Sequence, residues 1–139
     1  MFKETNRNCK REIMEKEFIP YEQALALKEL GFNEPCLAYY LAGGIRFKEY
    51  KDSQNKNSAF FNNTVCSIPT FSQAFRWFRE KYLLFGYSFP NDYQKYGYRI
   101  VEMTSNENKE LVYDWGTKDT YEESELECLK KLIEIVKEK

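Results

Sequence analysis

The stretch TYEESELECLKKLIEIVK, residues 120–137, decides the fold class because it predicts a long amphipathic helix that must pack against another layer. Thr120 and Glu123 have the spacing of a capping box, and acidic residues in the first turns precede lysines, so the charges complement the helix dipole. We expect a helix over 121–137, laid across a sheet or wedged between two neighbours. Its apolar stripe consists of Leu126, Leu129, Ile133 and Val136, widened by Cys128, Leu132 and Ile135.

Two further helices are predicted upstream. Residues 71–82 follow Thr70, a good N-cap, and carry aromatic side chains along one helical face. Residues 21–30 begin beside Pro20, which suits the first position of a helix, and end at Gly31, which readily takes the left-handed conformation of a helix stop. Both faces are expected to contribute to the core.

Two β-hairpins separate these helices. Residues 37–42 and 45–50 flank Gly43-Gly44, a pair that permits the positive φ angles of a tight turn. Residues 96–103 and 110–115 are rich in aromatic and β-branched side chains, and a polar turn joins them. The pattern therefore predicts four strands in two antiparallel pairs.

The resulting element order is α-β-β-α-β-β-α, which is typical of an α+β fold in which helices cover an antiparallel sheet. We expect one sheet and a single small domain over 1–139, with a charged N-terminal arm over 1–17. Residues 51–63 are expected to form a polar loop, and residues 86–95, which contain Pro90-Asn91-Asp92, to form another.

Charge and cysteine content restrict the classes of partner. The net charge of −1, from 21 basic and 22 acidic residues, disfavours nucleic-acid binding unless a local basic patch is present. No apolar run is long enough to span a bilayer, and the N-terminus lacks the apolar core of a signal peptide, so we expect a cytoplasmic protein without membrane contact. The four widely spaced cysteines predict free thiols, and we expect no metal site and no cofactor.

Histidine is absent, whereas 11 Tyr, 11 Phe and 2 Trp make up 17% of the chain. Without histidine, the Ser-His-Asp and Cys-His catalytic arrangements and the usual neutral-pH proton shuttle are excluded. Aromatic side chains are the commonest anchors of binding surfaces. The composition therefore favours a binding protein over an enzyme.

Three segments resemble a group of small proteins found repeatedly in tailed-phage genomes and related bacterial prophages. The segments are FIPYEQALALKELGF (residues 18–32), FSQAFRWFREKY (71–82) and TYEESELECLKKLIEI (120–135), together about a third of the chain. The resemblance transfers no catalytic or ligand residue. It implies a small accessory protein expressed inside an infected bacterial cell, where interference with host machinery or immune signalling is a common role.

The first candidate site centres on Trp77. On a helical wheel Trp77 falls roughly 120° from the aromatic face of residues 71–82, and basic residues surround it, so it could stack on a base while arginines bind phosphate. The alternative is that Trp77 packs under a loop. A tyrosine-rich stretch, Tyr87, Phe89, Tyr93, Tyr96 and Tyr98, could add exposed rings. The predicted ligand-binding residues are Trp77, Arg76, Arg79, Tyr96 and Tyr98.

These observations support three hypotheses. The leading one is a non-enzymatic, phage-type accessory protein that binds a small ligand or a host factor, in its sharpest form by sequestering a nucleotide-like immune signal. The second is a protein-interaction module, either a host-protein inhibitor or a homo-oligomeric structural accessory protein. The third is a phosphodiesterase that works without histidine, through carboxylates and a divalent ion.

Overall fold

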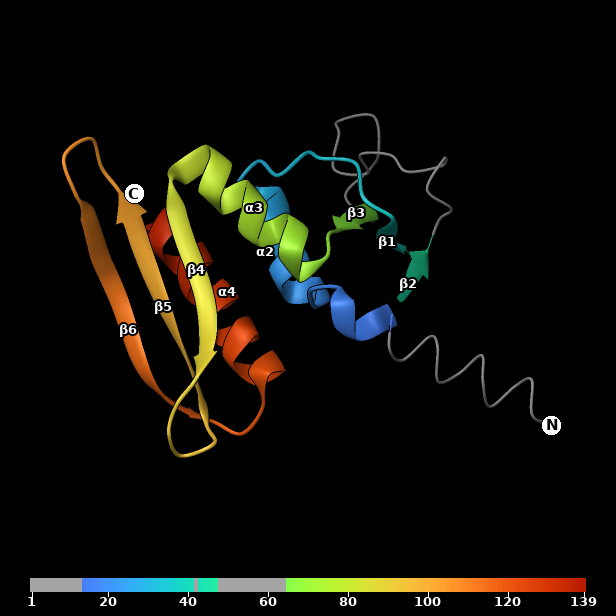
Figure 1. Ribbon diagram of the computed structural model, residues 1–139. Helices are drawn as coiled ribbons and strands as arrows, with labels where there is room; N and C mark the ends of the chain where they lie inside the picture. The colour runs from blue at the N-terminus through green and yellow to red at the C-terminus, as the bar shows by residue number, and fades with distance from the viewer. Residues whose placement is uncertain (1–13, 42, 48–64) are drawn as a thin grey trace. The chain divides into compact units, whose positions relative to one another are not determined.

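The computed structural model describes residues 14–41, 43–47 and 65–139 (Figure 1). The chain divides into two compact units, residues 1–71 and residues 72–139. Both units combine helices with antiparallel strands, which confirms the predicted α+β class. The single domain over 1–139 stays a prediction. The expected loop over 51–63 lies outside the described residues, as does most of the expected N-terminal arm, of which residues 14–17 are helical.

In the described part of the first unit, helix α2 and the helical residues 14–17 accompany a small sheet. Helix α2 (Tyr21–Glu29) ends before Gly31, which has the predicted left-handed conformation with φ 95°. Strands β1 (Ala38–Leu41), β2 (Gly44–Phe47) and β3 (Val65–Ile68) form an antiparallel sheet in the order β2-β1-β3.

Backbone contacts close this unit on itself. The Ile19 amide donates to the Pro69 carbonyl over 3.1 Å, and Phe18 forms an isolated antiparallel bridge with Thr70. The segment before α2 is therefore held beside the segment after β3. The fully buried side chains of this unit include Ile19, Leu27, Phe32 and Ile68.

The second unit is a three-stranded meander covered on one face by a helix (Figure 1). After α3 (Phe71–Tyr82), strands β4 (Leu84–Pro90), β5 (Tyr96–Met103) and β6 (Asn108–Lys118) pair antiparallel in chain order. Helix α4 (Tyr121–Lys137) then packs back across them.

The predicted C-terminal helix has the expected bounds and cap. Thr120 Oγ1 accepts a hydrogen bond of 3.2 Å from the Glu123 amide, which satisfies one donor of the first turn. Most of the predicted stripe is buried, whereas Leu126 and Ile135 are half-buried at its margins. The buried members are Cys128, Leu129, Leu132, Ile133 and Val136.

The expected sheet organisation needs correction. Within the described residues, two three-stranded sheets replace the single predicted sheet, because strands β3 and β4 join the two hairpins. Strand β4 falls largely in the segment expected to be a loop. The loop was predicted from Pro90-Asn91-Asp92, but Pro90 is tolerated at the end of an edge strand, where its missing amide hydrogen needs no partner. Gly86 also suits β4, because α4 leaves no room for a side chain there.

The turn of the first hairpin also differs from the expectation. Leu41 pairs with Gly44 and Tyr40 with Ile45, so Gly44 already belongs to strand β2 and the turn is not the expected Gly43-Gly44. Gly43 has φ 83°, the left-handed conformation that glycine adopts without strain.

Candidate functional site: an aromatic face on the C-terminal sheet

The two faces of the C-terminal sheet carry different side chains. Gly86 faces α4, because a Cβ built on it would lie 2.7 Å from the Cys128 Sγ. Ser88 faces the same way, and its Oγ lies 3.0 Å from the Oγ of Ser124. Successive residues of a strand point to opposite faces, so the side chains of Tyr87 and Phe89 lie on the face that α4 does not cover.

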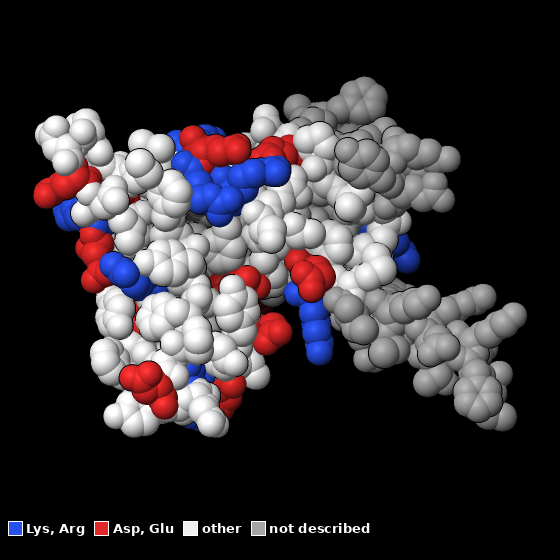
Figure 2. Space-filling view, in the orientation of Figure 1, with Lys and Arg blue, Asp and Glu red and all other residues white. Residues whose placement is uncertain are grey.

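Strand pairing brings further residues onto this uncovered face. Arg99 of β5 is in register with Tyr87 of β4 and with Tyr113 of β6. Trp115 follows Tyr113 by two positions and contacts its ring. We define the aromatic face as Tyr87, Phe89, Arg99, Tyr113 and Trp115. Figure 2 shows the surface over β4 and β5 as mostly uncharged, with isolated basic and acidic groups.

The rings of the aromatic face are exposed and in mutual contact. The Phe89 and Tyr113 rings stack with centroids 5.7 Å apart and planes inclined by 22°. Tyr113 and Trp115 meet edge-on at 6.2 Å. Trp115 is 65% exposed and Tyr113 49% exposed, so these rings offer open π surface.

Arg99 occupies the centre of the aromatic face. Its guanidinium carbon lies 5.7 Å from the centroid of Tyr87 and 5.9 Å from that of Tyr113, within cation–π range of both rings. The guanidinium also binds one carboxylate oxygen of Glu110, through Nε at 2.7 Å and Nη2 at 2.5 Å. A guanidinium has five N–H donors, so this contact leaves donors available for a ligand.

Two shallow hollows lie on the aromatic face. Tyr87, Phe89, Arg99 and Tyr113 line one of about 280 Å³. The second, of about 210 Å³, lies between Phe89, Tyr113 and Trp115 and the turn after β4. Because stacked rings form their walls, these hollows suit flat groups better than branched ones.

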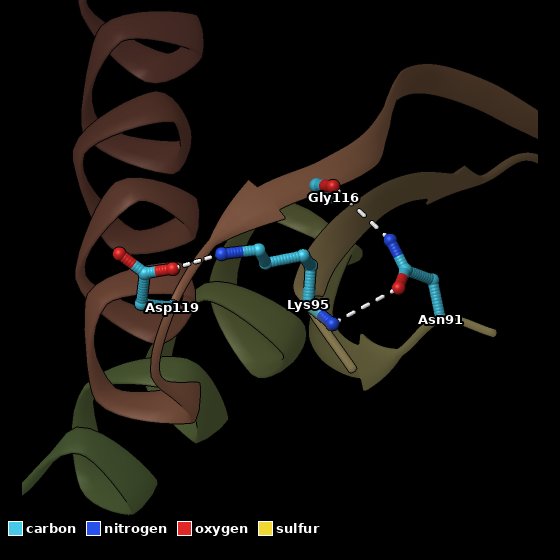
Figure 3. A network of polar contacts seen from close by, with 4 residues as sticks. All are labelled: Asn91, Lys95, Gly116 and Asp119. Carbon is cyan, nitrogen blue, oxygen red and sulfur yellow. Dashed lines mark hydrogen bonds and ion pairs between the residues drawn. The ribbon is translucent and has the colours of Figure 1, made fainter. Parts of the chain in front are cut away.

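A polar network fixes the turn between β4 and β5 against β6 (Figure 3). Asn91 donates from Nδ2 to the carbonyls of Gly116 at 3.1 Å and Trp115 at 3.3 Å, and its Oδ1 accepts from the Lys95 amide at 3.0 Å. Lys95 Nζ in turn pairs with Asp119, and this hydrogen bond lowers the pKa of the Asp119 carboxyl. The network therefore holds the backbone that carries Trp115.

Gly116 is required at this junction. It has φ 111°, and a Cβ there would lie 2.7 Å from the Asn91 Nδ2 and 3.0 Å from the Gly97 amide nitrogen. The adjacent register shift between β5 and β6 lies beside Trp115. Such irregularities commonly re-aim a side chain at a binding surface.

The structure does not bring the predicted ligand-binding residues together. Trp77 is only 6% exposed and packs edge-on against Phe78 and Tyr82, which corrects the expectation that its ring forms a stacking platform. The helical wheel placed Trp77 beside the apolar face of the helix over 71–82. In the structure this side of α3 is buried as well.

The other predicted residues are separated. Tyr98 is 8% exposed on the α4 side of the sheet, where burial and the carboxylate of Asp114 raise its pKa, so its ring is also unavailable for stacking. Tyr96 is half-buried and packs edge-on against Tyr121. Arg76 is exposed and pairs with Glu80 at 4.0 Å, whereas Arg79 lines a different hollow beside β4.

The residues that sequence reasoning missed are Arg99, Tyr113 and Trp115. Tyr87 and Phe89 belonged to the predicted tyrosine-rich stretch, but they were expected in a loop. The useful signal is alternation: aromatic rings occupy every second position at Tyr87-Ser88-Phe89 and again at Tyr113-Asp114-Trp115, as expected for strands with an aromatic face.

Metal and thiol chemistry receive no support in the described part of the chain. Residues 14–41, 43–47 and 65–139 contain no group of three His, Cys, Asp or Glu residues that could hold a metal ion. Burial raises the pKa of the Cys66 thiol to about 11 and that of Cys128 to about 12, so both thiols stay protonated at neutral pH. None of the described helices is long and apolar enough to cross a membrane.

No protein-family model, curated protein or solved structure matches this chain. The aromatic face is therefore assigned from its geometry alone.

Proposed function

We propose that this protein is a non-enzymatic binding protein that holds a nucleotide-like ligand on the aromatic face. The observation that carries the proposal is the position of the Arg99 guanidinium between the exposed rings of Tyr87 and Tyr113. A planar base can stack on such rings, and an adjacent guanidinium can donate to a phosphate. The ligand class is the one predicted from the sequence, but the residues are different.

The ion pair of Arg99 with Glu110 is compatible with an anionic ligand. Both side chains are more than a third exposed, at 38% and 43%, and an exposed ion pair contributes only about 0–1 kcal/mol. A phosphate can therefore bind the remaining N–H donors of Arg99 or displace the carboxylate at small cost.

The resemblance to tailed-phage proteins supplies the biological setting of the proposal. In an infected bacterial cell, the protein would act in the cytoplasm and lower the concentration of a nucleotide-like immune signal by binding it. This role needs no catalytic group.

The direct test is isothermal titration calorimetry of the full chain with ATP, GTP and cyclic di-GMP. We expect at least one of these nucleotides to bind, and Tyr113→Ala to weaken binding about tenfold or more because one stacked base is worth about 1–3 kcal/mol. Tyr93→Ala is the matched control, since Tyr93 is 74% exposed at the turn and outside the aromatic face. Equal affinity of Tyr113→Ala and the unchanged chain would reject this site.

A second candidate function is protein recognition by the same face. The favouring observation is that Glu110 already neutralises Arg99, which leaves a surface of Tyr, Trp and Arg side chains with little net charge, the composition of interface hot spots. Size-exclusion chromatography with light scattering, and capture of a host protein, would support this function if Trp115→Ala abolishes the complex while nucleotides fail to bind. The same chromatography reports whether the partner is a second copy of the chain.

A further inference from the structure

The outer edge of β4 has open backbone hydrogen-bonding groups. The Met103 amide donates to the Leu83 carbonyl over 2.9 Å, and the Asn91 amide donates to the Lys95 carbonyl over 2.8 Å. In an antiparallel pair, residues that exchange hydrogen bonds alternate with residues whose amide and carbonyl point away from the partner strand. With this register, the backbone groups of Gly86 and Ser88 point away from β5.

Strand β4 is an edge strand in its sheet, whose order is β4-β5-β6. Among the described residues, no further backbone hydrogen bond reaches Gly86 or Ser88. Pro90, which has no amide hydrogen, stands at the end of this edge, the place in a sheet where proline is tolerated. The open edge thus spans the middle of β4.

A hollow of about 220 Å³ lies along this edge. Helices α3 and α4 supply the walls beyond β4, so the edge faces a partly enclosed space. A strand added at this edge would be positioned by the walls of the hollow as well as by the backbone of β4. The lining residues are Ser72, Phe75 and Arg79 of α3, Gly86, Tyr87 and Ser88 of β4, and Tyr121 and Glu125 of α4.

Arg79 is the charged group that this hollow leaves unpaired. Within the described part of the chain, the Arg79 guanidinium makes no ion pair, whereas Arg76 on the same helix pairs with Glu80. Glu125, the other charged residue of the hollow, is already engaged within the protein. A half-buried guanidinium without a partner favours a carboxylate, which it can bind through two parallel hydrogen bonds.

We propose that the hollow beside β4 binds an extended peptide segment of a partner protein as an added strand, with an acidic side chain of that segment paired to Arg79. The backbone groups of Gly86 and Ser88 supply the main-chain hydrogen bonds of this strand addition, and the hollow receives alternate side chains. This site is distinct from the aromatic face, although Tyr87 borders both.

The test is selection of a displayed library of random heptapeptides on the full chain, followed by calorimetry with one enriched synthetic peptide. We expect enriched sequences to share Asp or Glu at one position. Arg79→Gln should weaken binding about tenfold, because hydrogen bonds between charged groups are lost, whereas the control Arg76→Gln should leave it unchanged. Tyr113→Ala should also leave it unchanged, which separates this site from the aromatic face.

N-methylation of the peptide provides a second readout that does not depend on the folding of any variant. A strand added to one edge uses every second amide, so methylation should weaken binding about tenfold at alternate positions and have little effect between them. Three outcomes would overturn the proposal: a library without enriched sequences, enriched peptides that bind Arg79→Gln as tightly as the unchanged chain, or an N-methylation profile without alternation.

Discussion

The Asn91 side chain hydrogen-bonds the Gly116 carbonyl over 3.1 Å and thereby joins the β4–β5 turn to β6. The same side chain accepts from the amides of Tyr93 at 2.9 Å and Lys95 at 3.0 Å, so it organises its own turn as well. The Asn91 side chain thus binds backbone carbonyls of β6 at the point where the pairing of β5 with β6 shifts register. The position of Trp115 on the aromatic face depends on this junction.

Asn91→Ala is expected to destabilise the protein by about 1–3 kcal/mol, because it removes hydrogen bonds and leaves partly buried backbone groups without partners. Urea denaturation measures this change in the free energy of unfolding. Asp92→Ala is the control in the same turn: Asp92 is exposed, and its replacement should change stability by less than about 0.5 kcal/mol. Equal effects of the two substitutions would show that Asn91 does not organise the junction.

Gly86→Ala is expected to destabilise the second unit by overpacking. An alanine Cβ at this position would lie 2.7 Å from the Cys128 Sγ and 3.0 Å from a methyl carbon of Leu132, closer than atoms in contact can approach. Overpacking of this kind costs about 1–3 kcal/mol.

The same contact supplies a double-mutant test. Cys128→Ala removes the nearest atom, so the cost of Gly86→Ala should be smaller in the Cys128→Ala background than in the unchanged chain. Additive effects of the two substitutions on the free energy of unfolding would contradict the close packing of Gly86 against α4.

Because its thiols are buried, we expect the free energy of unfolding of the protein to decrease at alkaline pH. The pKa of Cys128 is raised by burial from 9.0 to about 12, so the folded state keeps this proton while the unfolded state loses it. The contribution is therefore intact below pH 9 and decreases as the pH rises toward 12. Between these two pKa values the free energy of unfolding falls with a slope that approaches about 1.4 kcal/mol per pH unit.

Cys128→Ala should flatten this alkaline decrease relative to the unchanged chain, because the variant has no thiol proton to lose at this position on unfolding. Equilibrium urea denaturation at pH 8, 9 and 10 measures how the free energy of unfolding of each of the two proteins depends on pH. Identical slopes for Cys128→Ala and the unchanged chain would mean that the Cys128 thiol is not responsible.

The helices could be predicted from the sequence because their signals are local. The predicted bounds of the helices over 71–82 and 121–137 match α3 and α4, and the Thr120 cap forms as expected. Capping spacing and apolar periodicity act within a few turns, so they do not depend on distant parts of the chain.

The aromatic face could not be predicted because it depends on contacts distant in sequence. Both faces of β5 carry large side chains, and only the packing of α4 on Ile100 and Tyr98 leaves Arg99 on the open side. A sequence pattern identifies two faces of a strand but not which one a later helix covers. Strand β4 was not predicted because glycine and proline are depleted in strands. Gly86 and Pro90 nevertheless suit their positions in this edge strand.

The two tryptophans provide the last prediction, because they differ in exposure: Trp115 is 65% exposed and Trp77 only 6% exposed. Trp77→Phe, which leaves Trp115 as the sole tryptophan, should show red-shifted fluorescence and strong quenching by acrylamide. The Trp115→Phe variant retains only Trp77, whose indole packs against Phe78 and Tyr82. It should therefore emit at shorter wavelength and be quenched only weakly by acrylamide. A nucleotide bound on the aromatic face should protect only the Trp77→Phe variant. Quenching of equal strength in the two variants would contradict both the burial of Trp77 and the exposure of the aromatic face.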